Sequence, residues 1–442
     1  MSNLTASTTE SYRAGAYTLD KVHLFTNLNN PEQYIDLTNV CQSFIIKESI
    51  YSMGITLEFF VYDSRGLLEA FKIMGNEKIN VILSRRDVVS KEKKEYDLNL
   101  RIGKIDNYSR QKETMQAFKL TCVSDYVYHN NLIALTKPFS DSVGKSITDI
   151  CKNNLNINKD NLEIAKDTGS VTGVYPRLKP LSAIKWLLKN ITDNKTPFFF
   201  YERISDNKLV LESYKAMIDK DVYDEYTYEP YFDVPPIEKD LYELERKRIS
   251  TMSSDLDVSQ LESIADGCYG STLHTLDIAT KSYKTVEYNY NRDVKLNDND
   301  ALSDNMKLLD TPIKEFTKGK NFFISQNSLA YGANLNNYNN IISSGYLDSH
   351  SYLKNLNTLT INITINGDFD LKLGNKIHVS INRAGSDAKE IAVDKYFTGN
   401  YIITAIEHSF KERYKMNLTL KKDSFEDSID DIIQIQDRAR EV

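Results

Sequence analysis

The chain reads GDFDLKLGNKIHVSI from Gly367 to Ile381, YIITAIEHSF from Tyr401 to Phe410 and KMNLTLK from Lys415 to Lys421. Apolar and polar side chains alternate along these runs, which is typical of β-strands with one buried face. Gly374-Asn375 and Gly399-Asn400 are turn signals ahead of two of the strands. The stretch therefore predicts a small β-domain close to the end of the chain.

A similar stretch lies near the N-terminus. MGNEKINV (residues 74–81) parallels LGNKIHV (373–379), and LRIGKI (100–105) parallels YIITAI (401–406). Because the elements follow in the same order, we expect the β-domain to be duplicated within the chain. Three further apolar positions correspond in sequence: Phe118, Leu120 and Cys122 with Met416, Leu418 and Leu420. The signature positions of this pattern are Gly75, Asn76, Ile79, Ile102 and Ile105 in the first copy, and Gly374, Asn375, Ile377, Gly399, Tyr401, Ile403 and Ile406 in the second.

The region between the copies has a different character. Val143, Ile147 and Ile150 share one face of a predicted helix, and an apolar stripe at helical spacing follows Pro180. Two apolar runs around a turn at Asp206-Asn207 then predict a hairpin. We interpret this region as an inserted α+β domain.

The expected fold class is therefore mainly β with an α+β insertion. Residues 15–127 and 346–424 are predicted to form two related antiparallel β-barrel-like domains. Residues 128–232 are predicted to form the inserted domain. Residues 233–345 are expected to hold strands and loops shared between the inserted domain and the second barrel.

Within that shared region, weak alternation predicts strands in residues 241–249 and 273–290. A C-terminal helix or tail is expected over residues 425–442, with acidic residues first and arginines last, which suits the helix dipole. The helix could dock on its own domain, or it could be an arm that holds a partner.

Composition excludes several classes of protein. The 442 residues are 41% hydrophobic and 26% charged with a net charge of -7, which is an ordinary globular balance and gives no basic excess for a nucleic-acid groove. The N-terminus is polar and does not resemble a signal peptide, and no apolar run reaches the length that crosses a bilayer. The four cysteines lie far apart with no C-x-x-C pair, so we expect them to pack as small apolar residues.

No motif supplies chemistry. Gly144-Lys145-Ser146 resembles the end of a phosphate-binding loop but has Phe139 where the motif needs its first glycine. The acidic run 297–300 lacks the glycine and closing glutamate of a calcium loop. None of the six histidines lies within four residues of another, and no G-x-S-x-G is present. We therefore expect no catalytic residues, no metal ligands and no cofactor.

The order of these stretches resembles a known family. The run from Phe397 to Phe410 with the strand after it resembles the end of phage tail-hub proteins, and residues 367–377 look like the family's strand-turn-strand lead-in. At the other end, Glu48-Ser49-Ile50-Tyr51, followed by residues 62–64 and 74–77, is similar to the first β-domain of the baseplate central hub protein of contractile-tailed bacteriophages. The type VI secretion spike proteins are related to this family.

The resemblance implies a non-enzymatic homotrimer. Each subunit would carry two tube domains, so that three subunits present six in a ring of pseudo-sixfold symmetry. The ring would join the hexameric tail tube protein to a trimeric central spike protein, and its lumen would pass dsDNA or a tape-measure protein. The resemblance places the chain in the virion, in the tail baseplate, after synthesis in the host cytoplasm and without membrane insertion.

Three alternatives remain open at the level of sequence. A peptidoglycan-degrading tail enzyme would need two facing carboxylates. A receptor- or sugar-binding tail protein would need an exposed aromatic cluster, which the 28 tyrosines permit. The hub of a non-phage contractile injection system would have the same fold and role.

Overall fold

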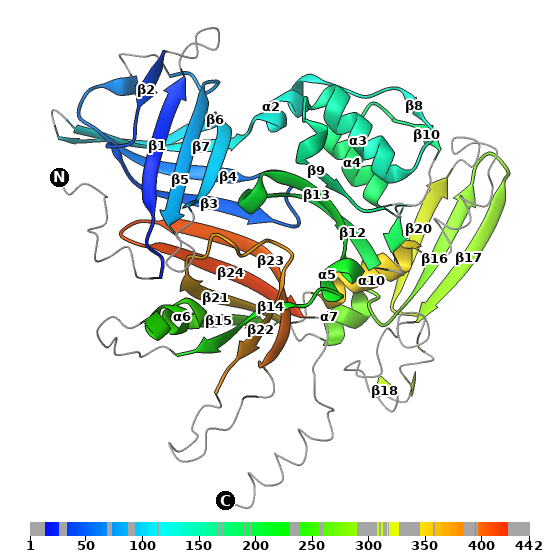
Figure 1. Cartoon of the computed structure of the whole chain (residues 1–442). Coiled ribbons are helices and arrows are strands. Elements are labelled where there is room, and N and C mark those ends of the chain that lie inside the picture. Colours follow the sequence, from blue (N-terminus) through cyan, green and yellow to red (C-terminus); the bar gives the residue numbers. More distant parts are fainter. Residues whose placement is uncertain are drawn as a thin grey trace, which may run out of the picture.

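The first barrel unit is an open, curved antiparallel sheet at the N-terminal end of the chain (Figure 1). The computed structural model describes residues 14–422 with gaps, the longest of which are 230–238, 290–306, 327–344 and 383–393; the predicted C-terminal helix lies outside the described residues. The strands of this unit follow the spatial order β2-β1-β5-β6-β7-β4-β3. Their bounds are β1 Thr18–Phe25, β2 Tyr34–Asp36, β3 Cys41–Ser49, β4 Thr56–Asp63, β5 Lys78–Arg86, β6 Lys93–Lys112 and β7 Met115–Ser124.

The second barrel unit is a closed ring of six strands. Each strand pairs with two neighbours in the order β14-β15-β21-β24-β23-β22, and β22 returns to β14. The contacts of β14 with β15 and β22 are parallel, and the other four are antiparallel. The bounds are β14 Val222–Tyr228, β15 Arg248–Leu256, β21 Leu359–Asn366, β22 Lys376–Ser380, β23 Gly399–Phe410 and β24 Tyr414–Lys422.

The two units share one strand order. The first runs β1-β5-β6-β7-β4-β3 and the second β14-β22-β23-β24-β21-β15. The prediction of two related β-barrel-like domains with an α+β insertion is therefore confirmed. The second unit closes through the short β14–β15 contact, whereas among the described strands no pair joins β3 to β1.

The copies also agree in register. Ile79 lies opposite Leu100 in the first unit, and Ile377 lies opposite Tyr401 in the second. In the first copy the ladder between β6 and β7 is interrupted after Ile102, and in the second the ladder between β23 and β24 is interrupted at the corresponding position. Since a bulge adds a residue at one defined point of a strand, these matching bulges keep the next residues, as far as Asp106 and Glu407, on matching faces; β6 has further irregularities after Asp106 that β23 lacks.

The inserted α+β unit has its own hydrophobic core, to which α3 and α4 contribute Val143, Ile147, Ile150, Ile184 and Leu187. The predicted helices and the predicted hairpin, β12 with β13, are confirmed. The elements of the unit are α2 Asp125–Leu132, β8 Pro138–Phe139, α3 Val143–Asn154, η2 Lys159–Asn161, β9 Leu162–Ile164, β10 Gly173–Val174, α4 Pro180–Leu188, β11 Thr192–Asp193, β12 Thr196–Arg203, η3 Ile204–Asp206, β13 Lys208–Ser213 and α5 Tyr214–Ile218.

The region between β14 and β21 supplies barrel strand β15 and a separate three-stranded sheet, β17-β16-β20. The expected strand over residues 241–249 is wrong for most of its length, because α6 covers it before β15 begins at Arg248. Leu241 and Leu244 lie three residues apart, a spacing that suits a helix as well as a weakly alternating strand. The elements are α6 Lys239–Lys247, α7 Gln260–Ala265, β16 Gly270–Asp277, β17 Ser282–Asn289, β18 Lys307–Leu308, β19 Thr311–Pro312, β20 Lys320–Gln326 and α10 Tyr346–Asn355.

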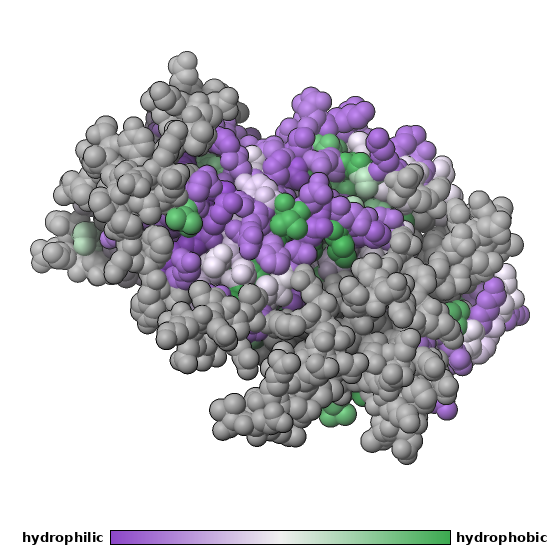
Figure 2. Space-filling view, turned by 60° about the horizontal axis from the view of Figure 1, so that its bottom comes forward, coloured by the Kyte–Doolittle hydropathy of each residue, from purple (hydrophilic) through white to green (hydrophobic). Residues whose placement is uncertain are grey.

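Hydrophobic side chains gather inside the molecule rather than on its surface. One cluster of buried apolar residues runs through both barrel units. Figure 2 shows one face of the molecule, where hydrophilic residues predominate among the described residues and hydrophobic ones are scattered. Across the part of the chain that the structure describes, no helix has the length and apolar character needed to span a membrane.

The two signature glycines offer a matched test of how the second barrel is fixed to the insertion. Both have positive φ, +94° at Gly75 and +79° at Gly374. A Cβ at Gly75 meets no atom within 4 Å, but a Cβ at Gly374 would lie 2.6 Å from the hydroxyl of Tyr201. We expect Gly75→Ala to lower the free energy of unfolding by about 1–2 kcal/mol, because alanine is strained in the left-handed conformation. Gly374→Ala should cost at least about 1 kcal/mol more, because Tyr201 must move.

The measurement is urea unfolding of the two full-length variants beside the parent chain. Equal losses of stability would mean that Tyr201 yields without cost, and would contradict the expectation.

Candidate functional site

The two barrel units are joined edge to edge by β3 and the second half of β23. The pairing is antiparallel and runs from Ala405 opposite Ser49 to Phe410 opposite Phe44. Since β23 also pairs with β24, a continuous sheet of eight strands results, β6-β7-β4-β3-β23-β24-β21-β15. This sheet runs from the second half of β6, beyond its pairing with β5, to the part of β15 beyond its pairing with β14.

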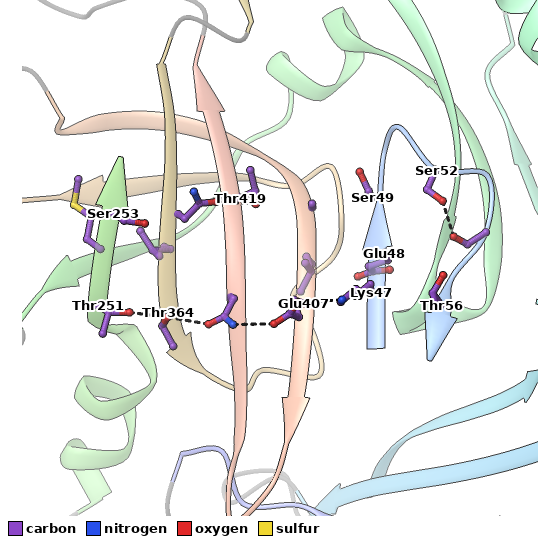
Figure 3. Close-up of a pocket in the computed structure, with 17 residues that line it drawn as sticks. Lys47, Glu48, Ser49, Ser52, Thr56, Thr251, Ser253, Thr364, Glu407 and Thr419 are labelled. Carbon is purple, nitrogen blue, oxygen red and sulfur yellow. Dashed lines mark hydrogen bonds and ion pairs between the residues drawn. The ribbon is translucent and has the colours of Figure 1, made fainter. Parts of the chain in front are cut away.

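Polar side chains connect the strands along one face of this sheet. Thr251 Oγ1 donates to Thr364 Oγ1 at 2.7 Å, and Thr364 Oγ1 donates to Asn417 Oδ1 at 2.8 Å. Asn417 Nδ2 donates to Glu407 Oε1 at 3.2 Å, and Glu407 Oε2 lies 3.7 Å from Lys47 Nζ. Figure 3 shows this row running straight across the strands from Thr251 to Lys47.

The row continues as ion pairs through the first unit. Lys47 Nζ lies 3.7 Å from Glu58, and Lys119 Nζ lies between Glu58 at 3.8 Å and Asp106 at 3.7 Å. Lys104 Nζ is 2.8 Å from Asp106. A hydrogen bond from Lys104 and the charges of Lys104 and Lys119 lower the pKa of the Asp106 carboxyl, although burial opposes the shift. We call the whole row, from Thr251 on β15 to Asp106 on β6, the polar ladder.

The ladder face is hollowed where the two units meet. A cavity of about 650 Å³ lies there, lined by side chains of β15, β21, β24, β23 and β3 and by the turn after β3. Its lining carries hydroxyl, amide and paired charged groups (Figure 3). Among the described residues no three potential metal ligands converge. The face therefore offers hydrogen bonds and compensated charge.

The opposite face of the junction buries a carboxylate. Glu48 and His408 are 3% and 1% exposed, and Glu48 Oε1 lies 3.2 Å from His408 Nε2. Glu48 Oε2 accepts the backbone N–H of Ile204 at 2.9 Å, and His408 Nδ1 lies 2.7 Å from the Tyr414 hydroxyl. Burial raises the pKa of Tyr414 far above its usual value, so the hydroxyl stays protonated. One side chain thus ties the first barrel, the second barrel and the insertion together.

A second carboxylate, which is partly buried, fixes the insertion to the turn between β3 and β4. Glu202 accepts hydrogen bonds from the Ser124 hydroxyl, from the Tyr126 hydroxyl at 2.8 Å and from the backbone N–H of Ile55 at 3.0 Å. Burial raises the pKa of Glu202, although these donors oppose the shift.

The structure places the signature positions in two equivalent sets, one in each unit, and not in a single cluster. Gly75 and Gly374 turn the chain before β5 and β22, and Gly399, with φ of +141°, begins β23. The Arg101 guanidinium donates to the backbone oxygen and to the side-chain oxygen of Asn76, both at 2.9 Å. Asn375 donates its backbone N–H to the Lys372 carbonyl. The remaining signature side chains lie on the paired strands: Ile79 and Ile377 on β5 and β22, Ile102 and Ile105 on β6, and Tyr401, Ile403 and Ile406 on β23. Their role in assembly remains a prediction.

The polar ladder was not predicted. Its members are the polar halves of alternating strands, which sequence analysis assigns only to a solvent face. The signal that could have found them is pairing of opposite charges and amides across strands, and that requires the strand order.

Known structures share this fold. No protein-family model and no curated protein matches the chain. A tail protein from Neisseria meningitidis aligns with a TM-score of 0.52 and 11% identity over 93% of this chain and 98% of its own. The 43 kDa tail protein of prophage MuSo2 from Shewanella oneidensis aligns with 0.51 and 9% over 90% and 97%. A type VI secretion component of Escherichia coli aligns with 0.44 and 8% over 86% and 73%. The chain shares its fold with the two tail proteins, which it matches over nearly their full length.

Glu48 and Glu407 give a test of the junction, because they lie on opposite faces of the joined sheet. Glu48→Ala leaves a buried histidine and a buried N–H without their acceptor, so we expect a loss of about 3 kcal/mol. Glu407→Ala removes an ion pair with Lys47, whose side chains are 46% and 38% exposed, and an exposed hydrogen bond from Asn417, and should cost less than about 1 kcal/mol. Denaturant unfolding of both variants measures the difference, and similar losses would contradict the assigned role of Glu48.

Proposed function

We propose that this chain is the structural hub of a contractile phage tail baseplate, a homotrimer of pseudo-sixfold symmetry. The observation that supports it most strongly is the internal β3–β23 junction between two units of the same strand order. If three chains repeat that junction between subunits, six units close a ring. Such a ring matches a hexameric tail tube on one side and seats a trimeric spike on the other.

Because the two units are equivalent, the strands that would pair between subunits can be identified. The counterpart of β3 in the second unit is β15, and the counterpart of β23 in the first unit is β6. Among the described strands, the part of β6 after Lys104 pairs only with β7, and β15 after Thr251 pairs only with β21. Unpaired edges invite a further strand. The edge of β15 in one chain therefore pairs with β6 of the next, and three sheets of eight strands give a wall of 24.

The polar ladder then lines the lumen, through which dsDNA or a tape-measure protein passes. Phosphate binding requires free lysine or arginine side chains. Lys47 and Lys119 each lie between two carboxylates, and Lys104 forms an ion pair with Asp106. Because each of these lysines is neutralised by a neighbour, the wall lets a polyanion slide. We assign no catalytic step to this chain, and the same role would serve a non-phage contractile injection system.

A second candidate, a receptor- or sugar-binding tail protein, is favoured by one feature. On the three-stranded sheet the rings of Tyr283 and Phe323 flank His274 with interplanar angles of 17° and 25°. Tyr283 is 55% exposed and Phe323 72% exposed. That role does not require ring closure, so the oligomeric state separates it from the hub.

Cysteine pairs test both the trimer and its strand register. Glu407 lies opposite Lys47 within one chain, and the equivalent positions between chains are Asp106 and Asp255. We expect Asp106→Cys/Asp255→Cys to oxidise into covalent trimers, seen on a non-reducing gel. The parent chain should have three times the chain mass of 50.7 kDa by light scattering.

The matched control is Lys47→Cys/Glu407→Cys, which has the same register but should form its bond within one chain. The four native cysteines are buried and do not compete. A monomeric parent chain would contradict the hub. A trimer without the Asp106–Asp255 bond would contradict the strand assignment.

The lumen assignment predicts an effect of charge on DNA binding. Glu58→Gln/Glu407→Gln removes both carboxylate partners of Lys47. The assembled variant should bind a short DNA duplex more tightly than the parent, with a salt slope steeper by about 0.9 for each new phosphate contact. Fluorescence anisotropy across a salt series measures this.

The control, Asp149→Asn/Asp160→Asn, makes the same charge change at two exposed residues of the insertion. If both double variants bind DNA equally, net charge rather than the ladder sets the affinity.

A further inference from the structure

A groove of about 720 Å³ lies between α4, β12, α10 and the turn after β3. Its wall is largely apolar and includes Tyr51, Leu181, Leu188, Phe199 and Leu353. Tyr51 packs edge-on against Phe199 and is 49% exposed, while Leu353 is 36% exposed. An apolar groove of this kind accepts the apolar face of a helix.

The rim of the groove is basic. Lys185 and Lys189 lie one helical turn apart at the end of α4, and both are exposed. Within the described part of the chain neither forms an ion pair, in contrast to the paired lysines of the polar ladder. The groove therefore suits an occupant that combines apolar and acidic side chains.

The described chain ends beside this groove. The last strand, β24, stops at Lys422, and Lys421 Nζ lies 4.9 Å from the centroid of the Tyr51 ring. Tyr51 is itself part of the groove wall. The segment that follows Lys422 therefore begins close to the groove.

The following sequence has the required character. Phe425, Ile429, Ile432 and Ile433 recur at the spacing of one helical face. A helix from 425 to 433 would measure about 13 Å. The other positions of this segment include four acidic residues: Glu426, Asp427, Asp430 and Asp431.

We propose that residues 425–440 bind as an amphipathic helix in the groove between α4 and α10 of their own chain. The isoleucines cover the apolar wall, and the carboxylates face Lys185 and Lys189. The tail thereby clamps the insertion to the second barrel, and this arrangement does not depend on whether the chain forms a ring.

Photo-crosslinking of the full-length chain tests this without requiring a defined register. A benzoylphenylalanine at Ile432 should crosslink to residues 181–189 or 346–355, as mapped by mass spectrometry. The same probe at Gln434, which falls outside the apolar face, should give a much lower yield. Mixing isotope-labelled and unlabelled chains identifies bonds within one chain.

Charge reversal adds a second readout. Lys185→Glu/Lys189→Glu should lower the crosslink yield about fivefold, since it replaces attraction of the acidic tail by repulsion. The control Lys152→Glu/Lys159→Glu alters two exposed lysines elsewhere on the insertion and should leave the yield unchanged. Crosslinks outside the groove, crosslinks only between chains, or equal yields in both double variants would overturn the proposal.

Discussion

Residues 44–49 and 405–410 come from opposite ends of the chain, yet they pair as neighbouring strands, and the architecture depends on that pairing. A strand has only two hydrogen-bonding edges. The first half of β23 uses one edge for β22, and the second half offers the same edge to β3 while β24 occupies the other. The bulge after Ile403 lets one strand close its own barrel and extend the sheet into the next.

The two faces of the junction meet different physical demands. On the buried face Phe44 stacks on Phe410 with ring centroids 4.6 Å apart. This apolar contact lies on the same face as the buried Glu48–His408 pair. A buried ionisable group needs all its partners, so it fixes one relative position of three units. On the opposite face the polar ladder ranges from partly buried to exposed, and its exposed ion pairs contribute little to stability. The relative position of the units is therefore set by the buried face, and the polar ladder face is not needed to fix it.

Much of the fold could be predicted from sequence because period-two alternation is local. The correspondence of Ile79 with Ile377 and of Leu100 with Tyr401 needed only residues within each copy. What alternation cannot give is the partner of an edge strand. The sequence analysis assigns Tyr226 on β14 to the insertion, although its strand pairs with β22 of the second barrel. The polar ladder was missed for the same reason: Asn417 faces Glu407 across the local β23–β24 hairpin, but Lys47 becomes a neighbour of Glu407 only through long-range pairing.

The equivalence of the two units also constrains how chains can assemble. A junction that joins two like units within a chain imposes one rotation, and repeating a head-to-tail contact gives either a closed ring or an open filament. For six like units a rotation of about 60° at each contact closes the ring. Because the internal contact is held by a buried carboxylate with two partners, Ile204 and His408, the second of which is itself held by Tyr414, its angle is set by the fold rather than by the surroundings. In the proposed trimer, three of the six contacts would lie within the chains and only the other three would have to form between subunits.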